Sequence, residues 1–380
     1  MNNKIKLSKS IVGEKEKQAI ATVIDEAYLG MGHFVQDFEN KLKEYLNIKH
    51  VVCVNTGTAA LHLAVMSAGL KPRDEVLVQS LTFVSCFQAI TAAGMVPVAC
   101  EVLPQTGIID LKDAEKRITK RTKAIMPIHY MGGVGDLDAI YAFARKHNLR
   151  VIEDASHAFG TVYNGKKIGS FGDIICFSFD GIKNITTGEG GIVVTNDDAV
   201  AEFIKDARLL GVQKDTEKRY QGARSWEFDV VHQGYRYHMS NIFAAIGLVQ
   251  LGRLESEFKP ARQKLASKYD ASLKDCDGIE LFEQDYSKVV PHIYVIKVKD
   301  GLRDALRDHL LQDNIETGIH YYPNHLLTFF SENKISLPVT EKVYSQILTI
   351  PLHPAVTDTD QDRVIKSILG FFNDKNRRSL

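Results

Sequence analysis

The strongest constraint on the fold is a series of short apolar runs that alternate with helical patterns between residues 51 and 195. Nearly continuous apolar runs of this length are typical of strands buried on both faces of a sheet. The segments between them, such as 136–147, space their apolar residues as a helix does. This β-α-β rhythm predicts an α/β fold with a mostly parallel sheet covered by helices on both faces. The predicted strands are 51–54, 75–78, 97–102, 124–128, 150–154, 173–178 and 191–195.

The chain beyond this region predicts a second, smaller unit. A large domain is expected over residues 1–255 and a small C-terminal α+β domain over 256–380, because a long helix at about 256–275 leads away from the alternating region. Residues 212–238 show no clear period and much charge, which predicts an irregular segment. The small domain is expected to contain strands at 292–298 and 315–321 and a final helix from about 358.

Composition excludes several classes of protein. Of the 380 residues, 44% are hydrophobic and 25% are charged, as in an ordinary globular protein with a large core. The formal net charge is zero, so we expect no nucleic-acid partner. No run reaches 18 apolar residues and the N-terminus has no signal-peptide core, so we expect neither membrane association nor export. The five cysteines are far apart, which predicts free thiols in the cytoplasm, with no disulfide framework and no metal site.

Polar residues follow several of the predicted strands, and ligands of such sheets bind beyond the carboxyl ends of the strands. Residues 55–60 (Asn-Thr-Gly-Thr-Ala-Ala) form a strand-to-helix turn whose free N–H groups could bind a phosphate. A plain helix cap is the alternative for this turn. Phe83 follows the next strand and could stack on a flat cofactor, although a core phenylalanine is the commoner case.

Two acid–base candidates lie further along the chain. Asp154 ends an apolar strand, where a carboxylate needs a cation such as a protonated pyridine nitrogen; a helix N-cap is the alternative. His157, three residues on, could bind a phenolic oxygen. Lys183 follows the strand end at Ser178, and a partly desolvated lysine has the neutral amine that a Schiff base requires. The alternative for Lys183 is a surface lysine on a hairpin loop.

Together these groups match the requirements of pyridoxal 5'-phosphate (PLP): a phosphate cup, a stacking ring, a carboxylate for the ring nitrogen and a Schiff-base lysine. The dinucleotide-binding glycine pattern and the P-loop pattern are both missing from the sequence.

The sequence resembles the DegT/DnrJ/EryC1/StrS family of PLP-dependent nucleotide-sugar aminotransferases, with motifs in the family's order from about residue 7 to 372. The motifs are residues 55–61, 153–160 (Glu-Asp-Ala-Ser-His-Ala-Phe-Gly), 169–173, 177–179, 183–191 (Lys-Asn-Ile-Thr-Thr-Gly-Glu-Gly-Gly), 234–240, 320–321 and 348–353.

The resemblance implies a fold-type-I aminotransferase that forms a homodimer with active sites at the interface. It implies that Lys183 is the Schiff-base lysine, that Asp154 pairs with the pyridinium and that His157 lies near the phenolic oxygen. Phe83 would stack on the ring, and the phosphate would be held by Thr58, Ala59 and Ser178. Arg236 stands where the family commonly has Asn, a residue that reaches the phosphate from the partner subunit; its target could be phosphate or substrate.

The implied activity is transfer of an amino group from L-glutamate to a nucleotide-linked keto-6-deoxy sugar, with C4 favoured over C3. The product would serve polysaccharide or glycan biosynthesis, such as that of O-antigen and lipopolysaccharide. Related sugar dehydratases replace the lysine with His, so Lys183 favours transamination. A PLP-dependent sugar dehydratase and a non-catalytic regulatory protein remain the alternatives.

Residues 208–238 could recognise the acceptor, because basic side chains and Trp226 suit a diphosphate and a stacked base or sugar. A solvated charged loop is the alternative, since acidic residues dilute this charge. His320, Tyr321 and Tyr322 are further candidates for the substrate cleft, with a structural role as their alternative.

Overall fold

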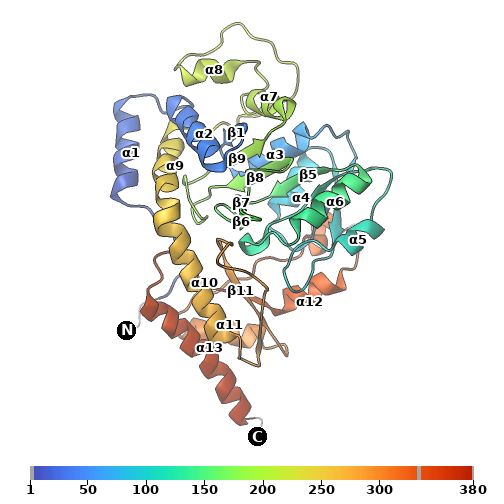
Figure 1. Cartoon of the computed structure of the whole chain (residues 1–380), viewed down its shortest axis with the longest axis vertical. Coiled ribbons are helices and arrows are strands. Elements are labelled where there is room, and N and C mark those ends of the chain that lie inside the picture. The colour runs from blue at the N-terminus through green and yellow to red at the C-terminus, as the bar shows by residue number, and fades with distance from the viewer. Residues whose placement is uncertain (1–3, 332–334, 379–380) are drawn as a thin grey trace.

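The computed structural model describes residues 4–331 and 335–378 and is built around a seven-stranded sheet (Figure 1). The strand order is β1-β9-β8-β5-β4-β2-β3. From β8 to β3 all neighbours are parallel, whereas β9 runs antiparallel to both β1 and β8. The strands are β1 (His50–Val54), β2 (Glu75–Gln79), β3 (Val96–Cys100), β4 (Thr122–Met126), β5 (Arg150–Asp154), β8 (Ile174–Ser178) and β9 (Gly191–Thr195).

Both faces of the sheet are buried, which explains the nearly continuous apolar strands. Alternate side chains enter two separate cores: Val51 and Cys53 of β1 join one, and Val52 and Val54 join the other. The first core is closed by helices α2, α6 and α9, and the second by α3, α4 and α7. The predicted α/β class and its mostly parallel sheet are therefore confirmed. These helices are α2 (His33–Leu46), α3 (Gly57–Ser67), α4 (Ser85–Ala92), α6 (Leu137–His147), α7 (Asp198–Ala207) and α9 (Asn241–Arg253).

The C-terminal part forms a three-stranded antiparallel sheet of order β10-β11-β12 with its own apolar core. Ile5, near the start of the chain, also packs into this core. The sheet lies at the lower end of the molecule in Figure 1, with helices α10, α11 and α13 around it. The elements are β10 (Ile279–Leu281), β11 (Tyr294–Val298), β12 (Ile347–Ile350), α10 (Lys259–Leu273), α11 (Arg303–Gln312), α12 (Pro338–Gln346) and α13 (Asp358–Arg378).

A π-helical turn, Leu254–Phe258, joins α9 to α10. We propose this turn as the boundary between the large and the small domain, in line with the division predicted at residue 255.

The strand predicted at 315–321 is wrong. Ile315 and Gly318 form only single bridges, to Ile5 and to Thr349 respectively. Two different neighbours therefore share the backbone groups of this segment, and neither pairs with it over a strand's length. The remaining elements are α1 (Glu14–Asp25), α5 (Leu111–Lys116), the two-stranded pair β6 (Val162–Tyr163) and β7 (Lys166–Lys167), and the 3-10 turns Tyr130–Gly132, Asn324–Leu326 and Thr328–Phe330.

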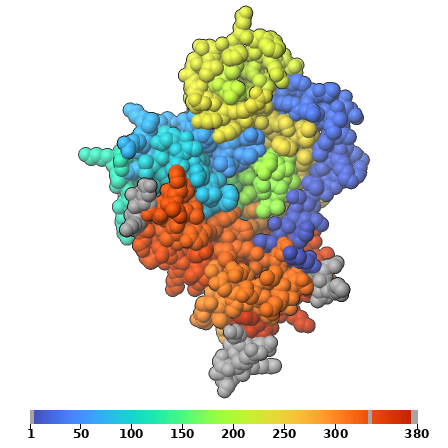
Figure 2. Space-filling model, turned by 180° about the vertical axis from the view of Figure 1, so that it is seen from behind, coloured from blue at the N-terminus to red at the C-terminus, as the bar shows by residue number. Residues whose placement is uncertain are grey.

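Residues 208–238 leave the body of the molecule and return to it, and they form the projecting end at the top of Figures 1 and 2. The segment is irregular except for a short helix, α8 (Asp215–Tyr220). The sequence of α8, Asp-Thr-Glu-Lys-Arg-Tyr, has no apolar stripe, so the periodic pattern could not reveal it. Within the described ranges, no helix is long and apolar enough to cross a membrane.

Candidate active site

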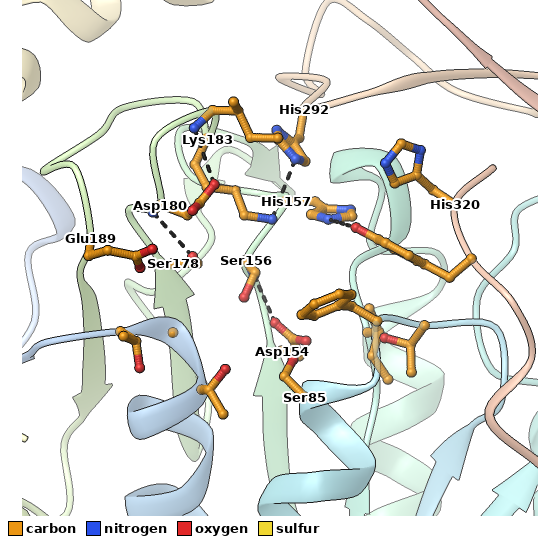
Figure 3. Close-up of a pocket in the computed structure, with 18 residues that line it drawn as sticks. Ser85, Asp154, Ser156, His157, Ser178, Asp180, Lys183, Glu189, His292 and His320 are labelled. Carbon is orange, nitrogen blue, oxygen red and sulfur yellow. Dashed lines mark hydrogen bonds between the residues drawn. The ribbon is translucent and has the colours of Figure 1, made fainter. Parts of the chain in front are cut away.

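A cavity of about 490 Å³ lies at the carboxyl ends of the strands of the large sheet (Figure 3). Eight of the ten residues predicted for the site line it: Thr58, Phe83, Asp154, His157, Ser178, Lys183, His320 and Tyr321. They come from separate strand ends, from the first turn of α3 and from the C-terminal part of the chain. The other two, Ala59 and Arg236, do not line it. The roles assigned to all ten residues stay predictions.

One wall of the cavity is a cup made where the N-terminus of α3 meets the end of β8. A Cβ atom on Gly57 would lie 2.7 Å from the Cβ of Ser178, so only glycine allows this approach. Gly191 of β9 meets the same turn, since a Cβ there would lie 2.6 Å from the Thr56 carbonyl oxygen. Helical geometry leaves the first N–H groups of α3 without partners in the helix, which makes the cup a suitable anion site.

The Ala59 N–H is already used within this turn. It donates to Thr56 Oγ1 at 3.0 Å, so Thr56 caps the helix, as the alternative interpretation held. Thr58, by contrast, is exposed to the cavity. The cap uses the N–H of Ala59, which does not line the cavity, whereas Gly57 and Thr58 do line it, so the cap and the cup are compatible.

Lys183 extends from the turn between β8 and β9 into the cavity, where its amine faces the His292 imidazole (Figure 3). The Nζ atom lies 3.4 Å from His292 Nε2. Burial is the main cause that lowers the pKa of Lys183 to about 8, although the charges of Asp154 and Asp180 act in the opposite direction. The interpretation of Lys183 as a surface lysine is therefore wrong: the side chain is only partly exposed and faces the cavity.

Asp154 ends β5 and is 5% exposed. Its Oδ1 accepts a bond from the Ser156 N–H at 3.0 Å, and its Oδ2 accepts one from the Cys86 thiol at 2.9 Å. No helix begins after Asp154, so the helix-cap interpretation is wrong. Among the described residues this carboxylate forms no ion pair, which leaves it suited to a cationic ligand.

Three imidazoles line the same cavity as the lysine amine. His157 Nε2 lies 3.1 Å from the Tyr321 hydroxyl, and the rings of His157 and His292 are 4.5 Å apart. Burial and the nearby Lys183 hold the pKa of His157 and of His292 well below the usual value, and the same causes lower that of His320 to about 4. All three rings are therefore neutral near pH 7, and each can serve as a hydrogen-bond partner without adding charge.

Phe83 is 54% exposed, and its ring lies 5.6 Å from that of Tyr321. An aromatic residue of this kind is normally covered, so the interpretation as a core phenylalanine is wrong. Because it lines the cavity, the ring is available to stack on a flat ligand.

Sequence reasoning missed His292, Asp180 and Glu189, which also line the cavity. His292 comes two residues before the small-sheet strand β11, so no strand-end rule pointed to it. It also missed Cys86, whose contact with Asp154 joins the first turn of α4 to the end of β5. A hydrophobic pattern contains no signal for either contact.

Arg208, one of the basic residues of the segment 208–238 that were expected to suit a diphosphate, differs from that expectation. Arg208 is fully buried, and its guanidinium contacts Glu39 Oε1 at 2.6 Å and the Cys53 carbonyl at 2.7 Å. It is therefore unable to reach a diphosphate. Arg236 is exposed and lies outside the cavity of its own chain.

The described residues fit PLP on several independent points. The glycine-lined cup suits a phosphate, the buried unpaired Asp154 suits a ring cation, and the Nδ1 atom of buried His157 has no partner. The Lys183 amine faces the same cavity. PLP would therefore be held by Lys183, Asp154, Phe83 and the cup.

Comparison with known proteins agrees with this geometry. The chain is 34% identical to the spore coat polysaccharide biosynthesis protein SpsC of Bacillus subtilis over 377 residues, which is 97% of each chain. PseC of Helicobacter pylori, an aminotransferase involved in pseudaminic acid biosynthesis, has a TM-score of 0.91 at 27% identity and covers 98% of this chain and 100% of its own. Spr1654 of Streptococcus pneumoniae, solved in a PLP form, has a TM-score of 0.89 at 26% identity and covers 98% of this chain and 99% of its own.

The family model of the DegT/DnrJ/EryC1/StrS aminotransferases matches residues 10–369. The predicted cofactor, PLP, is the cofactor of these aminotransferases. The cavity and the sequence relatives thus give the same answer, and the chain belongs to the DegT/DnrJ/EryC1/StrS aminotransferase family.

Proposed function

We propose that the protein transfers an amino group from L-glutamate to a nucleotide-linked keto-6-deoxy sugar, with C4 favoured over C3 as the position of the new amine. The observation that carries the proposal is the Lys183 amine in the cavity, in its partly desolvated state, beside the buried carboxylate of Asp154. A sugar as acceptor is supported by Spr1654, which is named as a sugar aminotransferase, and by SpsC, whose name refers to polysaccharide biosynthesis.

When bound, PLP supplies an electron sink for the carbon that carries the amine. In the proposed reaction, Asp154 keeps a proton on the ring nitrogen, and His157 orients the ring through its oxygen. The neutral Lys183 Nζ removes the α-proton of glutamate and returns a proton at the new amine-bearing carbon. A pKa of about 8 gives this amine a useful neutral fraction near pH 7. Ser178 and Thr58 bind the phosphate in the cup.

We further propose a homodimer in which Arg236 of one subunit completes the site of the other. Its exposed position outside its own cavity supports this assignment. Exposed apolar side chains on the same segment, such as Trp226 and Phe228, support a protein contact there. Mixing Lys183→Ala and Arg236→Ala subunits tests the idea, because only a hybrid dimer would contain one intact site and regain activity.

We place the reaction in the cytoplasm and in the synthesis of an amino sugar for a polysaccharide, with O-antigen and lipopolysaccharide as candidate products. The free cysteines of the chain, four of them buried, support a reducing compartment.

The direct test is a glutamate-dependent assay against a panel of dTDP-, UDP- and GDP-linked keto sugars. We expect 2-oxoglutarate and a new amino sugar in equal amounts from at least one of them. A product without incorporated nitrogen would identify a dehydratase, and failure of the protein to take up PLP would contradict the proposal.

A further inference from the structure

Arg262 of α10 is a buried cation without an acidic partner. It is 2% exposed, and among the described residues it forms no ion pair. Arg208, another fully buried arginine, shows the usual solution, a carboxylate 2.6 Å away on Glu39. A buried charge is costly unless hydrogen bonds replace its water. The buried guanidinium of Arg262 must therefore find other hydrogen-bond partners.

Backbone carbonyls take the place of the missing carboxylate. Arg262 Nη1 donates to the His292 carbonyl at 3.0 Å and to the Pro291 carbonyl at 3.3 Å, and it reaches that of Leu352 at 3.5 Å. Nη2 donates to the Lys183 carbonyl at 3.3 Å and to that of Ile182 at 3.4 Å. The planar guanidinium thus joins three separate segments of backbone.

Two of those segments hold the side chains that meet in the cavity. Lys183 Nζ and His292 Nε2 are 3.4 Å apart, and one guanidinium binds the backbone carbonyls of both residues. The neighbouring residue on α10, Gln263, donates to the Val289 carbonyl at 3.2 Å. Gln263 thus contacts the chain just before His292 and leaves the Lys183 turn untouched.

The charge of Arg262 also reaches the amine. Burial lowers the pKa of Arg262 to about 10, so the guanidinium stays charged near pH 7. Its charge contributes to the lowered pKa of Lys183, because it disfavours a second cation nearby. The other titratable groups facing Lys183 are Asp154 of β5, Asp180 of its own turn, Cys86 of α4, His157 after β5, His292 before β11 and His320.

We propose that Arg262 is a positioning residue for the reaction: by binding the carbonyls of Lys183 and His292, its guanidinium holds the lysine amine against the imidazole. The inference rests on the proposed function, because that function gives the amine its chemical role. The position of the amine is thereby fixed from the small-domain side of the cavity.

The first test measures the Lys183 amine in the protein without PLP. Acetic anhydride labelling across a pH series, read by peptide mass spectrometry, gives the midpoint of the amine titration. We expect about pH 8 in the wild type and a higher midpoint in Arg262→Met, because a like charge has been removed. Gln263→Met, the matched control on the same helix, should keep the wild-type midpoint.

The second test measures the dissociation constant of PLP. We expect Arg262→Lys to weaken PLP binding about tenfold, because a single ammonium cannot span three segments. A folded Arg262→Met with the wild-type midpoint would overturn the inference. An equal shift of the labelling midpoint in Gln263→Met would also overturn it, and so would an unchanged PLP affinity in Arg262→Lys. If Arg262→Met does not fold, the PLP affinity of Arg262→Lys decides between the outcomes.

PLP binding and nitrogen transfer by the wild-type protein distinguish a failure of this inference from a failure of the proposed function. Labelling needs no cofactor, so the Arg262 variants report on the amine even if no keto sugar is converted. A wild type that binds PLP but transfers no nitrogen would defeat the proposed function alone.

Discussion

The cavity wall and the segment 208–238 both carry polar side chains, but they hold them in opposite ways. In the wall, Asp154 is 5% exposed and both of its carboxylate oxygens accept hydrogen bonds. In the segment, Trp226 is 86% exposed. Side chains held by hydrogen bonds suit a cofactor that always binds in the same way. Side chains that are exposed in the single chain suit an acceptor substrate or a partner subunit.

The segment is nevertheless fixed where it leaves the body. The Tyr235 N–H donates to the Ala207 carbonyl at 2.6 Å, the Tyr237 N–H donates to that of Arg208 at 3.0 Å, and the buried pair of Arg208 with Glu39 lies beside them. Its base therefore belongs structurally to the cavity wall, and only its outer part is free. Substitutions in the wall should stop the chemistry, and those in the outer segment should weaken acceptor binding or the proposed subunit contact.

The largest effect is expected from Lys183→Ala. Without the amine, the group that moves the α-proton in the proposed reaction is missing, so turnover should fall by at least about 10³-fold. Steady-state production of 2-oxoglutarate from glutamate measures this loss. A normal rate in the folded variant would show that the site has been wrongly identified.

Asp154→Asn should follow, with a loss of roughly 10²- to 10³-fold in kcat. The amide keeps the size of the side chain but cannot hold a proton on the cofactor nitrogen. The thermal unfolding midpoint should change little, which separates this effect from unfolding. An unchanged rate would mean that the carboxylate only closes the turn to Ser156.

Cys86→Ala should lower kcat by about tenfold, because Asp154 loses one hydrogen-bond donor. Burial and the neighbouring Asp154 raise the pKa of this thiol well above the usual value, so it stays protonated and donates. Cys86→Ser should recover most of the rate. Cys176→Ala removes another buried thiol that makes no hydrogen bond to Asp154 among the described contacts, and it should keep the rate. A loss in Cys176→Ala equal to that in Cys86→Ala would indicate a general packing effect.

These three residues differ in how well the sequence revealed them. Lys183 and Asp154 follow buried strands, and the rule that ligands bind beyond strand ends predicted that both would face one cavity. Cys86 lies within an apolar helix pattern, where a thiol resembles any small core residue. Its contact with Asp154 joins the first turn of α4 to the end of β5, and periodicity contains no information about such a contact.

Contacts between the large sheet and the C-terminal part of the chain were equally unpredictable from the sequence. The sequence predicted the strands of the large sheet within a few residues, because each is buried on both faces. The sequence pattern could not show that His292 contacts Lys183, since the two residues are 109 positions apart. It also could not reveal that Arg262 binds the backbone carbonyls of both residues. Such contacts depend on how the two sheets pack together. The buried state of Arg208 was hidden as well, because its partner Glu39 comes from α2, which is distant in the sequence.

The smallest effect is expected from the outer segment. Trp226→Ala should raise the KM for the keto sugar about threefold to tenfold, because one exposed aromatic surface is lost. Glutamate alone should bleach the visible absorption band of the PLP-bound protein at the wild-type rate, since Trp226 does not line the cavity of its own chain. Phe329→Ala removes another exposed aromatic, 69% exposed, and is the matched control that should leave both values unchanged. If Trp226→Ala slowed the glutamate half-reaction as well, the segment would act on the cofactor site, and the division between a fixed wall and a free segment would fail.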